Sequence, residues 1–109
     1  MKFNEYQKEA LKTATYPKRG KNFVYPVLGL TGEAGEVAEK VKKVLRDKKG
    51  IIDTSTKEAL KKELGDVLWY LAILCHELGL DMDEVAKCNI EKLRDRKKRN
   101  VLHGKGDNR

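Results

Sequence analysis

The sequence is poor in the residues that carry most metal, redox and disulfide chemistry. Its 109 residues include only two cysteines and two histidines. Neither Cys75 nor Cys88 has a second ligand at the spacing of a metal site. Thiols of this kind, inside predicted helices, are typical of a small intracellular protein that keeps them reduced. The composition therefore favours neither a zinc nor an iron site.

Long apolar runs are also missing. No stretch approaches the roughly 18 consecutive apolar residues of a membrane span. The first residues, MKFNEYQKEALK, are charged and amphipathic, unlike a secretory signal. A chain of 109 residues has room for one domain with a modest core. We expect a cytoplasmic protein without membrane contact, with one domain in residues 1–99.

The positive charge is concentrated at one end of the chain. The net charge is +7, and residues 92–109 hold eight Lys or Arg against two Asp, so the rest is close to neutral. Residues 100–109 are predicted to be a basic, flexible tail. No helix-turn-helix pattern accompanies this charge, so nucleic-acid binding is disfavoured. A basic helical nucleic-acid-binding protein without catalysis remains an alternative.

Strand-like alternation is absent, and helical periodicity dominates. Pro26 suits the first turn of a helix. Ser55 with Glu58, and Asp81 with Glu84, are capping signals for two later helices. The predicted fold is all-α, a four-helix bundle-like protomer completed by homo-oligomerisation, because its long apolar faces exceed what one small domain covers. The predicted helices span residues 3–14, 26–46, 55–78 and 81–98.

Two acidic pairs lie in the most apolar segments. GLTGEAGEVAEKVKK (29–43) contains Glu33 and Glu36, and KKELGDVLWYLA (61–72) contains Glu63 and Asp66. Residues three apart share a helix face, and antiparallel packing would bring the two pairs opposite each other. Four converging carboxylates repel unless a cation intervenes. All the ligands are hard oxygens, which favours Mg²⁺ or Mn²⁺, and the Glu-x-x-His motif of di-iron bundles is absent.

Exposed surface charge is the competing interpretation of these pairs, because Glu at i and i+3 is common on solvated helices. Gly29, Gly32 and Gly35 argue for a site. Each glycine costs roughly 1 kcal/mol in a helix interior. Close approach of another helix, or of a ligand to the backbone, would explain them.

The paired motifs, and nearly the whole chain from about residue 5 to 96, resemble the MazG-type nucleotide pyrophosphohydrolases of the all-α NTP pyrophosphatase superfamily. Gly32 and Lys62 replace the leading Glu of each family motif, as in many short members. The resemblance implies Mg²⁺-dependent hydrolysis of nucleoside triphosphates to the monophosphate and pyrophosphate by a dimer or a dimer of dimers. Phosphoribosyl-ATP pyrophosphohydrolase and a dUTPase-like enzyme of the same superfamily remain alternatives.

The resemblance also implies roles for individual residues. The metal ligands would be Glu33, Glu36, Glu63 and Asp66, and the later Asn and basic positions Asn89, Lys92 and Arg96 would lie near the substrate. Either Glu33 or Glu36 could be the general base.

Three further residues have two interpretations each. Lys43 could bind phosphate, or it could pair with a neighbouring glutamate. Trp69 and Tyr70 could stack on a base, or they could belong to the core or to a dimer interface.

Overall fold

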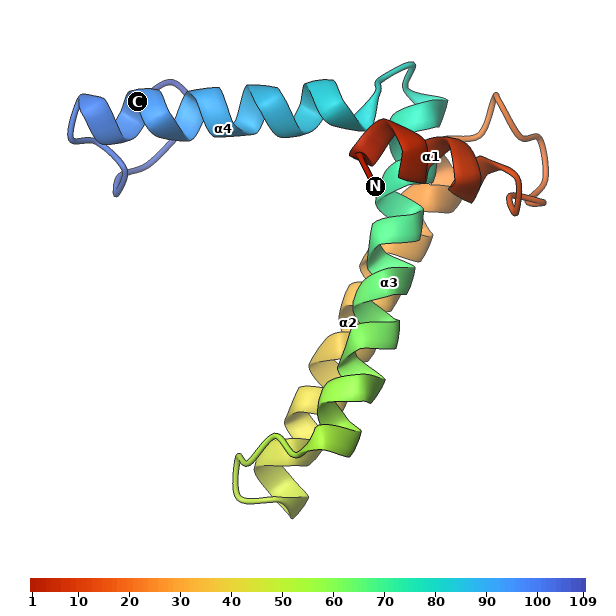
Figure 1. Ribbon diagram of the computed structural model, residues 1–109, viewed down its shortest axis with the longest axis vertical. Coiled ribbons are helices and arrows are strands. Elements are labelled where there is room, and N and C mark those ends of the chain that lie inside the picture. Colours follow the sequence, from red (N-terminus) through yellow and green to blue (C-terminus); the bar gives the residue numbers. More distant parts are fainter.

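The computed structural model describes all 109 residues and contains four helices and no strand. The predicted all-α class is therefore confirmed (Figure 1). None of the helices is both long enough and apolar enough to cross a membrane. The helices are α1 (Phe3–Leu11), α2 (Val24–Asp47), α3 (Thr54–Glu77) and α4 (Met82–Lys98).

The helix boundaries follow local capping chemistry. The predicted cap of the third helix at Ser55 with Glu58 is wrong, because Asp53 is the N-cap and its side chain accepts a hydrogen bond from the Thr56 N–H. Aspartate caps as well as serine does, so the earlier residue starts the helix. The predicted cap at Asp81 is confirmed, since its carboxylate accepts from the backbone of the fourth helix.

Other ends of helices also have identifiable causes. The first helix ends at Leu11, three residues earlier than expected. The third ends just before Gly79, whose φ of +69° is a left-handed conformation that glycine adopts without strain. The Leu80 N–H returns to the Cys75 carbonyl and closes the end of that helix.

Helices α2 and α3 form a long antiparallel hairpin (Figure 1). Contacts along its length fix the register: Lys40 lies 3.4 Å from Glu63, and Lys48 near the turn donates to Thr56 at 2.8 Å. Pairs of residues whose two sequence numbers have about the same sum therefore face each other across the hairpin. This register brings the two acidic segments together.

The core lies where α1 crosses α3 and the start of α4. Gln7 is buried there and joins the three elements, because its amide donates to the Ala72 and Leu80 carbonyls and accepts from the Met82 N–H. The apolar part of this core is small, and consists of Ala10, Ala14, Tyr16, Ala72, Ile73, Cys75 and Met82.

Within one protomer the four helices do not close into a bundle, because α4 projects away from the α2–α3 hairpin (Figure 1). The radius of gyration is 16.9 Å, against about 13 Å for a compact domain of this length. Only 12 of 109 residues are buried. Many apolar side chains are consequently left exposed along the three longer helices, among them Val27, Leu28, Val41, Leu45, Leu64, Ile90 and Leu93.

Residues 100–109 contain no helix and curl back along α4 (Figure 1). Arg96 is buried beneath them and donates to the Asp107 carbonyl at 2.9 Å. Arg109 donates to the Val101 and Leu102 carbonyls. The flexibility of this segment stays a prediction.

Glu77 at the end of α3 anchors the loop between α1 and α2. Its carboxylate accepts hydrogen bonds from the Tyr16 hydroxyl and, at 2.9 Å, from the Gly20 N–H. Burial alone would raise the pKa of Glu77, but the hydrogen bonds from Tyr16, Gly20 and Asn22 outweigh it and lower that pKa. Burial and the bond to Glu77 raise the pKa of Tyr16 to about 12.

We predict that Glu77→Gln lowers the free energy of unfolding near neutral pH by about 1 kcal/mol, because an amide accepts hydrogen bonds less strongly than a carboxylate. A carboxyl group with a lowered folded-state pKa stabilises above its ordinary value of 4.5, and the stabilisation is lost as pH falls through the lowered pKa. The difference from wild type should therefore shrink in acid. Urea unfolding at several pH values measures it.

Glu9→Gln is the matched control, because Glu9 is exposed and contacts only Lys12. Equal unfolding free energies for Glu77→Gln and the wild type at neutral pH would show that the carboxylate does not anchor the loop.

Candidate functional site

Three carboxylates meet across the hairpin. Oxygen atoms of Glu33 from α2 and of Glu63 and Asp66 from α3 all lie within 4.8 Å of one another. Glu33 and Glu63 are partly buried, whereas Asp66 is exposed. These three residues are called the acidic triad below. The antiparallel register of the hairpin is what brings them together.

The electrostatics of the acidic triad are those of crowded like charges. Partial burial, together with the charges of Asp66, Glu63 and Glu36, raises the pKa of Glu33 above its ordinary value. A shared hydrogen bond with Glu63 acts in the same direction. Like charges at this separation favour binding of a proton or a cation. Three oxygen ligands without sulfur or nitrogen fit a hard divalent cation, so the cluster could bind a metal.

Glu36, the fourth predicted ligand, stands apart from the acidic triad. It lies one turn beyond Glu33 on α2, it is exposed, and it is not among the three carboxylates that converge. Its charge still reaches Glu33 and contributes to the raised pKa there. Glu36 therefore lies beside the acidic triad but is not part of it.

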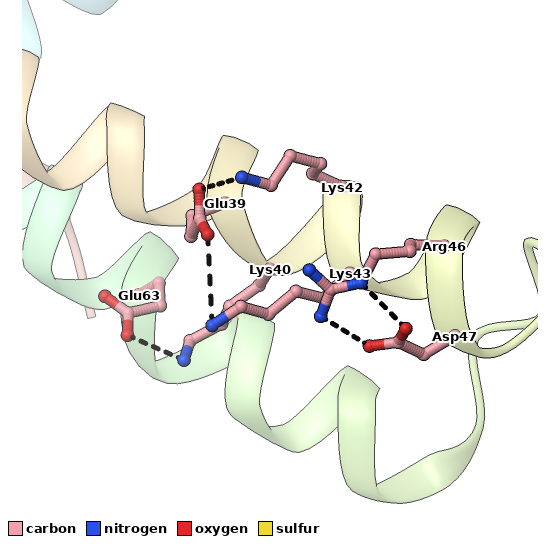
Figure 2. Close-up of polar contacts among 7 residues, drawn as sticks. All are labelled: Glu39, Lys40, Lys42, Lys43, Arg46, Asp47 and Glu63. Atoms are coloured by element: carbon pink, nitrogen blue, oxygen red, sulfur yellow. Dashed lines mark hydrogen bonds and ion pairs between the residues drawn. The ribbon is translucent and has the colours of Figure 1, made fainter.

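Lysines line the hairpin on the side of the acidic triad nearest the turn (Figure 2). Lys40 lies 3.4 Å from Glu63 across the hairpin, a pairing between helices that sequence spacing alone did not indicate. Lys42 and Lys43 both reach Glu39, at 2.9 Å and 3.9 Å (Figure 2). The alternative prediction for Lys43, a pair with a neighbouring glutamate, therefore occurs in the structure as a long contact.

Aromatic side chains lie on the other side of the acidic triad. The Tyr70 ring packs directly on Gly29 and fills the space that a Cβ at this position would need. Close approach therefore explains Gly29, while Gly32 and Gly35 face open space. Burial and a hydrogen bond with Tyr25 raise the pKa of Tyr70, and the charges of Glu33 and Asp66 add to this.

Trp69 and Tyr25 have different surroundings. The Trp69 indole donates to the Thr13 hydroxyl at 2.8 Å, and so fastens the end of α1 to α3. Tyr25 is 40% exposed and stacks on Tyr16 with ring centroids 5.1 Å apart. Its ring also lies 6.3 Å from that of Tyr70. Tyr25 was not predicted as a site residue, although its position next to Pro26 and near Phe23 could have drawn attention to it.

The predicted substrate residues of α4 are not brought to the acidic triad within one protomer. Asn89 and Lys92 line a separate cleft of about 460 Å³ that contains none of the triad. Arg96 is buried and engaged by the C-terminal segment. Because α4 projects away from the hairpin (Figure 1), the substrate role of these residues stays a prediction.

The chain is similar to a phage protein and to one protein family. The chain is 47% identical to the "Gene 37 protein" of Mycobacterium phage L5 over 109 residues, covering 95% of this chain and 96% of that protein. No solved structure matches the chain. Residues 26–101, which contain both acidic pairs, match the model of the MazG nucleotide pyrophosphohydrolase domain. This match covers well over half of the chain, so the protein belongs to the MazG nucleotide pyrophosphohydrolase family.

Proposed function

We propose that the protein hydrolyses nucleoside triphosphates, ribo- or deoxyribonucleotides, to the monophosphate and pyrophosphate with Mg²⁺, or Mn²⁺ in its place. The observation that carries the proposal is the convergence of the acidic triad, Glu33, Glu63 and Asp66, inside a MazG domain. A bare triphosphate would be repelled by these carboxylates. A divalent ion held by Glu33, Glu63 and Asp66 would neutralise that repulsion and would supply the positive charge that stabilises the phosphoryl group during attack.

Glu36, the carboxylate beside the acidic triad, suits the role of general base. Glu36 is exposed and lies outside the close cluster, so it is the acid best placed to accept a proton from the attacking water. The new bond joins the water oxygen to the α-phosphorus, and the α–β bridging oxygen leaves with pyrophosphate. Glu33 is a less suitable base, because as one of the converging carboxylates its oxygen atoms would be occupied by the cation.

A second copy of the chain would complete the fold. The protomer leaves large apolar side chains exposed on α2, α3 and α4, and α4 extends from the hairpin without a partner (Figure 1). A homodimer, or a dimer of dimers, would cover these side chains. It would also allow Asn89 and Lys92 to approach the acidic triad of a partner, which their own protomer does not permit.

The first prediction from this proposal concerns metal binding and stability. Mg²⁺ or Mn²⁺ at millimolar concentration should raise the melting temperature, because an ion that binds only the folded state stabilises it. Asp66→Asn should abolish the rise. Glu33→Gln should abolish it too, yet should raise the melting temperature of the metal-free protein, since it removes a repelled charge. A thermal melt with and without chelator measures both effects.

Glu58→Gln is the control, because Glu58 is exposed on α3 and contacts only Lys61. A melting curve of the wild-type protein that Mg²⁺ leaves unchanged would count against the metal site.

The second prediction concerns turnover. Each nucleoside triphosphate is incubated with Mg²⁺, and the products are separated to show whether pyrophosphate or orthophosphate appears. We expect pyrophosphate, and we expect Glu36→Gln or Asp66→Asn to lower kcat on the order of a hundredfold, because each removes a group needed in the transition state. Comparing dUTP and phosphoribosyl-ATP with the other substrates tests the two alternatives within the superfamily.

Lys92→Ala should instead mainly raise KM, since a phosphate contact present in both ground and transition state contributes uniform binding. Release of orthophosphate, or wild-type turnover by folded Glu36→Gln, would refute the proposed chemistry.

The third prediction concerns assembly. Light scattering at micromolar concentration should give the mass of two or four chains, because the exposed apolar area is too large for one. Leu28→Lys on α2, where Leu28 is 67% exposed, should shift the mass toward one chain. The control Lys57→Glu changes an exposed charge elsewhere and should leave the mass unchanged. An active monomer would rule out the proposed assembly.

A further inference from the structure

The C-terminal segment covers a cation on α4 that has no acidic partner. Arg96, in the last turn of α4, is only 5% exposed, because residues 100–109 fold back over it (Figure 1). Its guanidinium donates to the main-chain carbonyl of Asp107 at 2.9 Å. None of the ion pairs in the structure includes Arg96. A buried charge is costly unless an opposite charge accompanies it, so this neutral carbonyl compensates the guanidinium only in part.

The segment itself is held by polar contacts. Arg109 donates to the carbonyls of Leu102 at 3.0 Å and Gly106 at 2.6 Å, and both contacts are exposed. Residues 102–108 are all exposed, so the segment adds little apolar burial. Segments with exposed hydrogen bonds and few apolar contacts open at a small cost in free energy. The segment can therefore leave Arg96 while α4 stays folded.

The position of a hinge follows from the backbone. Asn100, directly after α4, has a φ of +59°, the left-handed conformation in which helices commonly end. The next residue, Val101, donates its N–H to the Arg96 carbonyl at 2.8 Å. Rotation at Asn100 would therefore move the segment away from Arg96 as a unit.

The face of α4 that the segment covers is one to which the MazG resemblance assigns substrate contacts. Asn89, Lys92 and Arg96 follow one another at i, i+3 and i+7 and share this face. Lys92 is exposed and has no ion pair, whereas Arg96 is covered. The closed segment thus leaves one available cation on the face, and an open segment would leave two. A charge-assisted hydrogen bond from a guanidinium to phosphate is roughly twice as strong as one between neutral groups, so phosphate is a better partner for Arg96 than the Asp107 carbonyl.

We propose that residues 101–109 form an autoinhibitory strap, which occupies Arg96 in the free protein and is displaced by the phosphate groups of the substrate. This inference rests on the proposed function and adds a regulatory contact to the phosphate-binding face of α4. A strap that is closed about nine-tenths of the time would raise the apparent Kd of a phosphate ligand about tenfold.

The experiment is calorimetric titration of pyrophosphate, in the presence of Mg²⁺, into full-length variants. Arg109→Met removes the side chain that holds the strap closed. We expect it to lower the Kd of pyrophosphate about tenfold, although it removes a positive charge. Lys105→Met is the matched control, because it removes the same charge from the same segment and Lys105 makes no hydrogen bond or ion pair. It should not lower the Kd.

A second variant opens the strap without changing its charge. Gly106 has a φ of +85°, which residues with a side chain adopt only under strain. Gly106→Val should therefore lower the Kd of pyrophosphate as Arg109→Met does. Circular dichroism checks that each variant retains its helices.

The effect must depend on Arg96 if the strap acts by covering it. In an Arg96→Met background, Arg109→Met should leave the Kd of pyrophosphate unchanged. An equal decrease in that background would overturn the proposal. An unchanged Kd in Arg109→Met would overturn it too, and a raised Kd would show that the segment helps to bind the ligand and does not block it.

Pyrophosphate binding requires no hydrolysis, so this experiment is separate from the test of the proposed function. A protein that releases no pyrophosphate from any nucleotide refutes the proposed function. The Kd values of the strap variants decide the strap, and absence of pyrophosphate binding to both the wild type and Arg109→Met would overturn it.

Discussion

Repulsion among three carboxylates is the constraint on which the rest of the structure depends. Glu33, Glu63 and Asp66 lie within 4.8 Å of one another, and like charges at such distances oppose the packing that brings them together. The hairpin supplies that packing through contacts on both sides of the cluster. The Tyr70 ring lies on the bare backbone of Gly29 on one side, and Lys48 donates to Thr56 on the other. The helices are therefore held in register despite the charge between them.

The same hairpin arranges three kinds of side chain in order along its length. Aromatic rings lie toward the α1 end, carboxylates lie in the middle, and lysines lie toward the turn. The lysines toward the turn are paired with acids, Lys40 with Glu63 and Lys48 with Asp53. The carboxylates of the acidic triad are instead crowded together, so the triad is the part of the hairpin that a bound cation would stabilise most.

Much of the fold could be predicted from the sequence, because helical periodicity and caps are local. Asp81 capped α4 as expected, and the i, i+3 spacing of the acids was enough to expect convergence across an antiparallel hairpin. The start of α3 was mistaken because Asp53 and Ser55 are both good caps and differ by only two residues. Capping preferences alone are too similar for Asp53 and Ser55 to decide which of the two residues is the N-cap.

What could not be predicted depends on three-dimensional arrangement. Spacing treats Glu33 and Glu36 alike, yet only Glu33 joins the triad, because it is partly buried against α3 whereas Glu36 is exposed to solvent. The pairing of Lys40 with Glu63 is likewise set by the hairpin register. The direction of α4 depends on the short turn at Gly79, whose geometry is not encoded in periodicity.

The central claim is that the acidic triad is a metal site, and direct binding of Mn²⁺ without nucleotide tests it most simply. Electron paramagnetic resonance of free Mn²⁺ measures how much ion the protein removes from solution. The account predicts saturable binding to the wild-type protein that Asp66→Asn weakens at least tenfold and that Mg²⁺ displaces. Equal Mn²⁺ binding by the wild type and Asp66→Asn would contradict it.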